Sequence, residues 1–326
     1  MSVDDDPSAG DTQPAASRVS PSRKTHRTLQ LLSGLSPGHR SLADAAAIAA
    51  NPGVIADIFG ATDVGRKREI NQDQFLVAAL ERSLLVEGSS LPAEAGTRLT
   101  DTPQGRLLIV ADGIGGHGGG ELASAVAIDA MAHYAFEAMP WAMGSSGCST
   151  DELADGLRDA VAKAQARMLR VAERKNAPQD LGTTLTMAYL VWPELHLVHV
   201  GDSRAYLFRD GALHRLTRDH TLAQQLVDEA AMTPEQAARS RYSHVLVNAV
   251  GGGIDTLDVE LHRLHLQMED QLLLCTDGLY DMVGDDEIGS HLKRTDREVE
   301  SVVHGLVKAA NEAGGRDNVT VVLARF

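Results

Sequence analysis

Short hydrophobic runs bounded by turn residues dominate the chain from about residue 54 onward. Most of these runs are rich in Val, Ile, Leu or Tyr and end in Gly, Asp or Pro, a pattern typical of β-strands. The predicted strands are Val54–Thr62, Gln74–Leu80, Arg106–Ala111, Thr183–Val191, Glu194–Val200, Arg204–Arg209, Ala212–Arg215, Gln271–Thr276 and Asn318–Ala324. The dipeptide Asp210-Gly211 separates two of them and predicts a tight hairpin.

Four longer segments repeat their apolar residues at three- and four-residue spacing, which predicts helices. They are Glu121–Met139, Thr150–Lys175, Thr221–Ala230 and Asp296–Ala313. Strands come in consecutive runs and helices in pairs, without the alternation that parallel βαβ units produce. This order favours an antiparallel, layered α+β domain over a doubly wound sheet. Residues 81–105, between two strands, are predicted to form a loop insertion.

The N-terminal segment has a different composition. Residues 1 to about 40 are rich in Ser, Pro, Thr and Arg and have few large apolar side chains, so they should be disordered. A short Ala-rich stretch follows, and Asn51-Pro52-Gly53 ends it. We therefore divide the chain into a disordered or weakly ordered tail, residues 1–50, and a folded domain, residues 54–326.

Charge and cysteine content exclude several classes of protein. The formal net charge is −15, which argues against a nucleic-acid binder and against attraction to anionic lipid. The two cysteines, Cys148 and Cys275, are far apart, so neither a disulfide scaffold nor a zinc site is expected. Cys275 lies in an apolar run and is read as a buried small hydrophobe. No stretch reaches transmembrane length and none before Leu29 is hydrophobic, so we expect a cytoplasmic protein.

Candidate chemistry comes from aspartates at strand ends. Asp112, Asp202, Asp277 and Asp317 each lie at or just past the end of an apolar strand, beside a small residue, and Asp73 precedes a strand. Turn geometry alone explains any single Asp-Gly pair. For four together a cation is the better explanation, because clustered carboxylates repel and lose hydration worth several kcal/mol each. Hard ions such as Mg²⁺ or Mn²⁺ prefer such oxygen ligands.

Seven segments, in this order, carry a resemblance to a known family. They are Thr62–Asp73, Ala111–His117, Leu181–Thr184, Val200–Tyr206, Leu216–Thr221, Thr276–Leu279 and Asp317–Thr320. The series resembles the metal-dependent Ser/Thr protein phosphatases of the protein phosphatase 2C family, in their bacterial form. It extends from about residue 55 to the C-terminus. The resemblance implies a four-layer α-β-β-α sandwich of two antiparallel sheets flanked by helices, with the metals at one end.

The same resemblance implies a set of ligands for two Mn²⁺ or Mg²⁺ ions. Asp112 would bridge the two ions, and the carbonyl of Gly113 would bind one of them. Asp277 and Asp317 would complete the coordination of the first ion, while Asp73 would act nearby, largely through coordinated water. One further position, Asp202, matches a residue that holds a third, weaker ion together with Asp277 in bacterial members.

The reaction that the resemblance implies is hydrolysis of phosphoserine and phosphothreonine. Two close cations lower the pKa of a bridging water, and the resulting hydroxide attacks the phosphorus directly. Arg68 matches the phosphate-binding arginine of the family, whose planar fork suits a phosphoryl group. The alternative reading of Arg68 is a solvated loop charge, since Arg66 and Lys67 lie beside it.

Several positions depart from the family pattern. Gln72 stands where many members have Glu, which removes a direct carboxylate contact to the second ion, and Asn248 stands where an Arg is frequent. Ile114 replaces a histidine proposed as general acid in eukaryotic members, and His117 is read as a loop residue, so the acid stays unassigned. For His220, a structural hydrogen bond at a helix start is favoured over a role as metal ligand or base.

We expect a monomeric enzyme that acts on phosphoproteins, either the targets of a Ser/Thr kinase or the kinase itself. The segment Asp228–Asn248 corresponds to the flap over the substrate cleft in this family. Two other classes remain open: a non-catalytic module that binds phosphoproteins, and an acidic cation-binding protein without phosphate chemistry. The first of these predicts loss of metal-site carboxylates, yet Asp112, Asp277 and Asp317 are all present.

Overall fold

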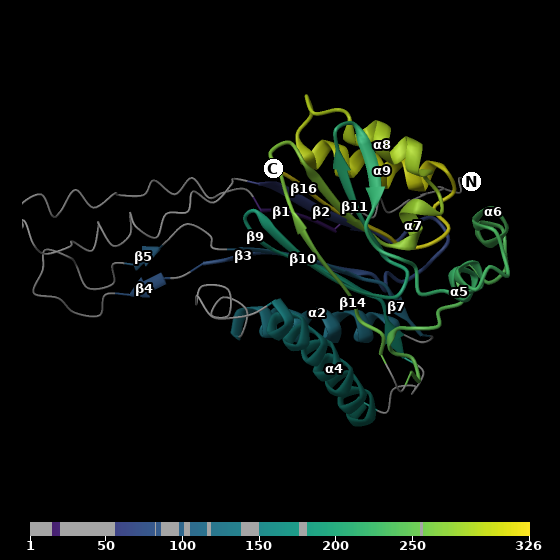
Figure 1. Ribbon diagram of the computed structural model, residues 1–326, viewed down its shortest axis with the longest axis horizontal. Coiled ribbons are helices and arrows are strands. Elements are labelled where there is room, and N and C mark those ends of the chain that lie inside the picture. The colour runs from purple at the N-terminus through teal and green to yellow at the C-terminus, as the bar shows by residue number, and fades with distance from the viewer. Residues whose placement is uncertain are drawn as a thin grey trace, which may run out of the picture.

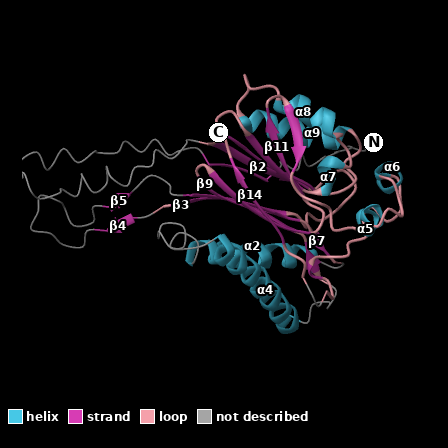
Figure 2. Cartoon of the chain, viewed as in Figure 1, coloured by secondary structure: helices cyan, strands magenta, loops and turns pink. Residues whose placement is uncertain are grey.

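The computed structural model describes residues 15–19, 56–81, 83–85, 98–100, 105–115, 119–137, 150–175, 181–254 and 257–326. Two antiparallel sheets pack face to face, and helices cover the outer face of each (Figures 1 and 2). The predicted four-layer α-β-β-α sandwich is therefore confirmed.

The first sheet has six described strands, and all neighbours in it run antiparallel. In spatial order they are β1 (Ala15–Val19), β2 (Asp57–Asp63), β16 (Val319–Arg325), β15 (Gln271–Cys275), β11 (Arg204–Arg209) and β12 (Ala212–Arg215). The β11–β12 hairpin turns through Asp210 (φ 52°) and Gly211 (φ 78°). Both central residues are left-handed, as a type I′ turn requires, so the predicted hairpin is confirmed.

The second sheet has five strands, again all antiparallel. Their order is β14 (Glu260–His265), β10 (Glu194–Val200), β9 (Leu185–Val191), β6 (Gly105–Ala111) and β3 (Gln74–Leu80). A small sheet of β13 (Val250–Gly251), β8 (Gly182–Thr183) and β7 (Gly113–Ile114) lies beyond the end of β6. The predicted loop insertion at 81–105 contains a two-stranded ribbon, β4 (Ser83–Leu85) with β5 (Arg98–Thr100).

Helices form the outer layers and one peripheral pair. The five-stranded sheet is covered by α2 (Gly119–Glu137) and α4 (Thr150–Lys175). The six-stranded sheet is covered by α7 (Asp277–Tyr280), α8 (Asp285–Leu292) and α9 (Val299–Glu312). Outside both sheets lie α5 (Leu222–Asp228) and α6 (Pro234–Ala238).

Side chains alternate between the two faces of each strand, and they form three hydrophobic layers. On β6, Leu107 and Ile109 pack under α2 and α4, while Leu108 and Val110 fill the space between the sheets. Cys275 on β15 is fully buried against the α9 side, which confirms its reading as a core residue. Because β6 and β15 are buried on both faces, each gives a continuous apolar run in the sequence.

Strand prediction worked best for strongly patterned segments. The bounds of β3, β10, β11, β12 and α4 are as predicted. The predicted strand Thr183–Val191 is wrong as a single element, because it is divided between β8 and β9 of different sheets, and the other predicted elements differ at their ends. The short helices α6, α7 and α8 were not predicted. The prediction missed β14, whose sequence Glu-Leu-His-Arg-Leu-His is only partly buried at the sheet edge. Within the predicted tail, β1 is the described part. The division into tail and domain stays a prediction.

Candidate active site

Asp112 lies immediately after β6, and its backbone is held from both sides. The Asp112 amide donates to Thr184 Oγ1 at 2.8 Å, and the Thr184 amide donates to the Asp112 carbonyl at 2.9 Å. The Thr183 hydroxyl donates to the same carbonyl at 2.8 Å. Three hydrogen bonds thus fix the point from which the Asp112 side chain extends.

Asp73 is the most enclosed of the five predicted aspartates, with 1% of its surface exposed. Its Oδ2 accepts hydrogen bonds from the hydroxyls of Thr276 and Thr320, each at 2.7 Å. Its Oδ1 is buried and has no hydrogen-bond partner among the described residues. Burial raises the pKa of Asp73 to about 6, although the two hydroxyls oppose the shift.

Asp277 begins α7, with one residue between it and the end of β15, and within the described part of the chain its buried carboxylate oxygen Oδ1 also lacks a hydrogen-bond partner. Burial raises its pKa well above the ordinary value, and the nearby carboxylates of Asp202 and Asp281 raise it further. Gly278 makes this position possible. A Cβ there would lie 1.9 Å from the Asn318 carbonyl oxygen, so the start of α7 packs directly on the chain that leads into β16.

Asp202 lies in the turn between β10 and β11 and is 4% exposed. Burial and the carboxylate of Asp219 raise its pKa to about 7, against the opposing charge of Arg204. Side-chain contacts hold the turn between β10 and β11 in place. Arg204 binds both oxygens of Asp219, at 2.9 and 2.6 Å, and lies 3.5 Å from the centre of the Tyr280 ring. The Tyr280 hydroxyl donates to the Asp202 carbonyl at 3.0 Å.

Asp317 and Arg68 form the outer edge of the cluster. Arg68 Nη2 donates to Asp317 Oδ2 at 2.6 Å, and 54% of the Arg68 side chain is exposed. The pKa of Arg68 is raised by this hydrogen bond and also by the charges of Asp112 and Asp277. The guanidinium therefore lies within the field of the aspartates while still facing solvent.

These five aspartates are one electrostatic unit. Burial raises the pKa of Asp112 well above its ordinary value, and Asp73, Asp277, Asp202 and Asp317 each add to the shift. Carboxylates held this close destabilise each other's charge unless a cation compensates. Two buried oxygens without partners, on Asp73 and Asp277, are the acceptors that an oxygen-seeking divalent ion or its bound water satisfies. The residues present therefore fit a divalent cation.

Gly113 and Gln72 shape the loop that follows Asp112. A Cβ at residue 113 would lie 2.2 Å from the Gly120 carbonyl oxygen, so only glycine fits against the start of α2. The Gln72 side-chain amide donates to the Gly115 carbonyl at 2.9 Å, and its backbone amide donates to Asn318 Oδ1 at 2.8 Å. Gln72 thus braces the loop. His117, just beyond, lies outside the described residues.

Sequence reasoning missed two residues beside the site. Asp281 is four residues after Asp277, and its pKa is raised mainly by burial. His244, within the segment predicted to be a flap, has its Nδ1 3.5 Å from Asp281 Oδ2 and 3.8 Å from Asp277 Oδ2. The i+4 spacing on a helix could have indicated Asp281. The approach of His244 is a tertiary contact with no local signal.

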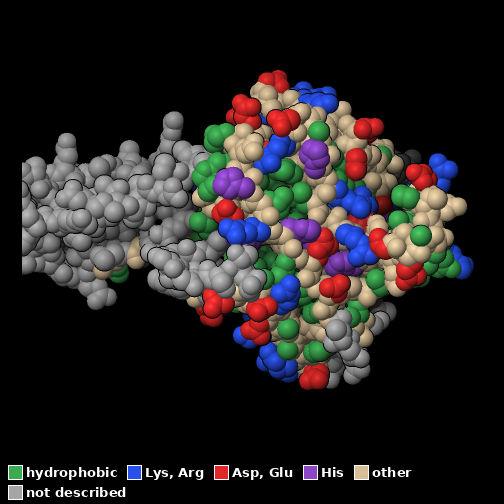
Figure 3. All heavy atoms as spheres, viewed as in Figure 1, with side chains coloured by type: hydrophobic (Ala, Val, Ile, Leu, Met, Phe, Trp, Pro, Cys, Tyr) green, Lys and Arg blue, Asp and Glu red, His purple; other side chains and the backbone are tan. Residues whose placement is uncertain are grey.

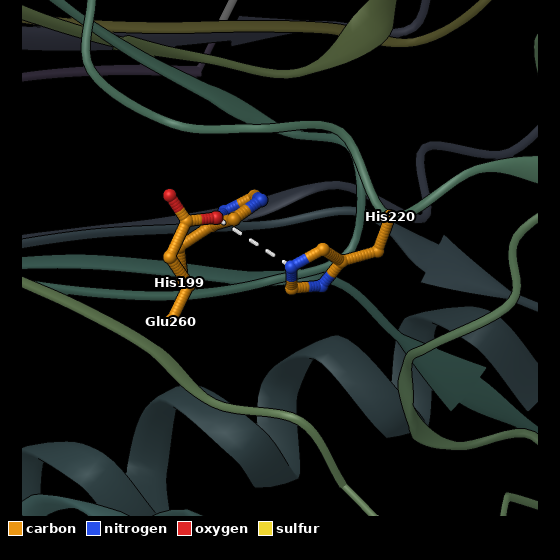
Figure 4. Close-up of side chains that lie close together, drawn as sticks. All are labelled: His199, His220 and Glu260. Atoms are coloured by element: carbon orange, nitrogen blue, oxygen red, sulfur yellow. Dashed lines mark ion pairs between the residues drawn. The ribbon is translucent and has the colours of Figure 1, made fainter. Parts of the chain in front are cut away.

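A second group of polar residues, His199, His220 and Glu260, offers three potential ligand atoms within 4.8 Å of one another (Figure 4). The Arg218 carbonyl, 3.0 Å from His199 Nε2, can only accept, so that nitrogen carries the proton. His199 Nδ1 faces the Thr186 hydroxyl at 2.9 Å. Burial and His220 lower the pKa of His199 to about 4, so the ring is neutral.

The tautomer of His220 is fixed in the same way. Its Nδ1 accepts from the Gly201 amide at 3.1 Å and faces the Asn248 side-chain amide at 2.8 Å. Its Nε2 then carries the proton and lies 3.5 Å from Glu260 Oε2. Burial opposes the charge of Glu260, but hydrogen bonds from His220 and His262 outweigh it and lower its pKa to about 2. The nitrogens are committed to hydrogen bonds, which supports the structural reading of His220.

Asn248 belongs to this hydrogen-bonded group. Besides His220, its side chain bonds the backbone of Asp258 in both directions, at 2.6 and 3.3 Å. These residues also line a cavity of about 290 Å³ together with Arg218 and Thr221. The departure at position 248 therefore lies in a buried hydrogen-bonded connection between two loops.

Comparison with known proteins identifies the family. The family model described as protein phosphatase 2C matches residues 89–322. The chain belongs to the protein phosphatase 2C family. The matched segment contains four of the clustered aspartates, while Asp73 and Arg68 precede it. For these two residues, their place in the site rests on the contacts described above.

Bacterial phosphatases are among the relatives of this chain. The chain is 38% identical over 219 residues to the serine/threonine protein phosphatase PstP of Mycobacterium tuberculosis, a match that covers 67% of this chain and 40% of PstP. It thus spans less than half the length of that protein. The serine/threonine phosphatase stp of Listeria welshimeri is 31% identical over 217 residues, covering 67% of this chain and 83% of stp.

Solved structures agree with the fold. The crystal structure of M. tuberculosis PstP matches with a TM-score of 0.65 and 33% identity over 83% of this chain and 98% of that one. The catalytic domain of PstP in complex with 2 manganese ions matches with a TM-score of 0.63 and 33% identity, covering 83% of this chain and 97% of that one.

Proposed function

We propose that this chain is a protein-serine/threonine phosphatase that hydrolyses phosphoserine and phosphothreonine in proteins with the help of divalent cations. The observation that carries the proposal is the convergence of buried carboxylate oxygens without partners, on Asp73 and Asp277, beside Asp112 and the exposed guanidinium of Arg68. A hydrogen-bonded core does not explain such a group, because buried polar atoms in a core are normally paired. A site for a cation and a phosphate does explain it.

The proposed metal ligands are Asp112, Asp277 and Asp317 with the carbonyl of Gly113, and Asp73 acts through water. Two Mn²⁺ or Mg²⁺ ions bound there would lower the pKa of a water and offset the charge of the phosphoryl group. The relative PstP has been solved with two manganese ions, which supports this choice of ion. We propose Asp202 and Asp277 as ligands of a third, weaker ion.

The protein's own contribution is positioning. Hydroxyls of Thr276 and Thr320 hold one oxygen of Asp73 and leave the other free. Arg68, oriented by Asp317, presents its remaining N–H groups to solvent, where a phosphoryl oxygen is bound by a charge-assisted hydrogen bond. The described residues around the cluster include no cysteine nucleophile, since Cys275 is buried in the core.

We further propose phosphoproteins as substrates, a Ser/Thr kinase or its targets as partners, a monomeric state and a cytoplasmic location. Acidic and basic side chains intermingle over the face in Figure 3, without an extended basic region. This pattern and the net charge of −15 disfavour nucleic acid as a partner. No helix in the described part of the chain is long and apolar enough to cross a bilayer.

The test is release of phosphate from p-nitrophenyl phosphate and from a phosphothreonine peptide, with Mn²⁺ and with a chelator. We expect turnover only with the cation. A wild-type protein that hydrolyses neither compound contradicts the proposal. Calorimetric titration with Mn²⁺ separates the non-catalytic alternative, for which at most one weak site is expected, from the two-ion site proposed here.

A further inference from the structure

The loop after β2 carries three consecutive basic residues at the edge of the aspartate cluster. Arg66, Lys67 and Arg68 are all exposed, and so is Arg316, in the loop that leads into β16. In the described part of the chain Arg68 forms an ion pair with Asp317. Arg66, Lys67 and Arg316 form no ion pair there. Unpaired cations grouped at one place are notable in a chain whose net charge is −15.

Backbone contacts hold the two basic loops together. The Arg66 amide donates to the Gly315 carbonyl at 2.7 Å, and a Cβ on Gly315 would lie 2.7 Å from Arg66 Cγ. Gly65 has φ +80° and packs so closely on Asp317 that a Cβ would lie 2.2 Å from its carbonyl oxygen. The basic side chains therefore extend from a fixed platform directly beside the Arg68–Asp317 pair.

The charges of this platform do not serve the cations of the active site, which need acidic ligands, and no acid in the described part of the chain forms an ion pair with Arg66, Lys67 or Arg316. One acid, the exposed Glu69, lies in the same loop and offsets one of the positive charges. Arg204 and Arg209, by contrast, are each paired with an aspartate. Because Arg66, Lys67 and Arg316 have no ion-pair partner in the part of the chain that the structure describes, their charges are available to an external anion.

We propose that Arg66, Lys67 and Arg316, here called the basic rim, select phosphopeptides with acidic residues next to the phosphoserine or phosphothreonine. This inference rests on the proposed phosphatase function and assigns the substrate class of the same site. When the phosphoryl group binds at Arg68, residues one to three positions away in an extended peptide lie within about 10 Å. That distance is within reach of long, flexible Arg and Lys side chains on the adjoining loop.

Two matched phosphothreonine peptides test the basic rim, one with glutamates and one with lysines flanking the phosphothreonine. For the wild type we expect kcat/KM to favour the glutamate peptide by about tenfold, the size that two or three exposed ion pairs give. In the double variant Arg66→Gln/Lys67→Gln the preference falls to about twofold. Hydrolysis of p-nitrophenyl phosphate, which has no flanking residues, stays at the wild-type rate.

A matched control removes the same number of charges at the other end of the sandwich. Lys293 and Arg294 are adjacent, exposed and just past α8, whose Leu292 carbonyl accepts from Gln271 at the start of β15. Asp277 follows the far end of that strand. The variant Lys293→Gln/Arg294→Gln should therefore keep the full preference. Glu69→Gln, which removes the negative charge in the loop of the basic rim, should increase the preference for the glutamate peptide.

Salt provides a second readout. Raising salt from about 0.1 M to about 1 M shortens the Debye length from about 10 Å to about 3 Å, so the wild-type preference should shrink. Equal kcat/KM for the two peptides, a preference for lysine, or an equal loss of preference in the control variant would overturn the inference. A loss of p-nitrophenyl phosphate hydrolysis in Arg66→Gln/Lys67→Gln would overturn it too. Failure of the wild type on every compound would instead refute the proposed function.

Discussion

The hydroxyl of Thr320 donates a 2.7 Å hydrogen bond to the buried Oδ2 of Asp73, a residue 247 positions away in the chain. Thr320 belongs to β16 of the six-stranded sheet, whereas Asp73 directly precedes β3 of the other sheet. The bond therefore connects the two sheets at the site. Asp73 is held in place by the packing of the sandwich itself.

Replacing Thr320 with valine tests this connection. Thr320→Val keeps the shape of the side chain but removes a donor to a buried carboxylate, so we expect a loss of about 1–3 kcal/mol in the free energy of unfolding. Urea denaturation with and without Mn²⁺ measures it. Thr295→Val, at an exposed position, is the control and should change stability by less than about 0.5 kcal/mol. Equal effects of the two substitutions would refute the role given to Thr320.

The raised pKa values predict how the metal-free protein responds to pH. Asp73 and Asp202 have pKa values of about 6 and about 7 in the folded chain, against an ordinary 3.8. At pH values between 3.8 and about 7 the folded chain binds more protons than the unfolded chain, so the free energy of unfolding decreases as pH rises. Each unit of pKa difference corresponds to about 1.4 kcal/mol.

The free energy of unfolding, measured by urea denaturation in chelator between about pH 5 and 7.5, should therefore fall by an amount on the order of a few kcal/mol. Saturating Mn²⁺ should abolish or reverse this slope, because the cation favours the ionised carboxylates. Chelation at neutral pH should lower the melting temperature for the same reason. A metal-free protein whose stability rises with pH over this range would contradict the buried, cation-free carboxylate cluster.

Arg68 is expected to act on phosphate binding. Arg68→Ala removes a charge-assisted hydrogen bond worth about 1.5–3 kcal/mol, so kcat/KM should fall by roughly 10- to 100-fold. Arg68→Lys keeps the charge but loses the fork and should recover only part of the activity. Inhibition by inorganic phosphate should weaken in parallel. Unchanged inhibition in Arg68→Ala would instead support the solvated-loop reading of this residue.

The group of His199, His220 and Glu260 should not bind the catalytic cations. Because both histidine tautomers are fixed by hydrogen bonds, Glu260→Gln should leave the number of bound Mn²⁺ ions unchanged. Metal analysis after dialysis measures this number. Asp277→Asn, by contrast, should reduce it. Loss of an ion in Glu260→Gln would show that the group is a metal site.

Much of the fold was predictable because its strands are strongly patterned. Runs such as those of β6 and β15 are apolar on both faces, and the turn at Asp210-Gly211 has a local sequence signal. The edge strand β14 carries polar residues on a partly buried surface and gives no such signal. Its place depends on pairing with β10.

The residues of the site are also of two kinds, those with a signal in the local sequence and those without one. Asp112, Asp202 and Asp277 are predictable because aspartates that follow strands are visible in the sequence. The same prediction for Asp317 was wrong, because Asp317 lies in the loop that precedes β16. The supporting contacts were not, since the Thr320–Asp73 bond and the approach of His244 to Asp281 join segments far apart in the chain. Only the packing of the two sheets and of the segment Asp228–Asn248 brings those residues together.

The most direct measurement compares the wild type with Asp112→Asn in the hydrolysis of a phosphothreonine peptide, with and without Mn²⁺. Asp112 lies at the centre of the cluster, and the other four aspartates all act on its pKa. We predict Mn²⁺-dependent turnover by the wild type and a loss of at least about 100-fold in the variant, as expected when a central electrostatic group is removed. Turnover that needs no cation, or that Asp112→Asn leaves unchanged, would contradict the account.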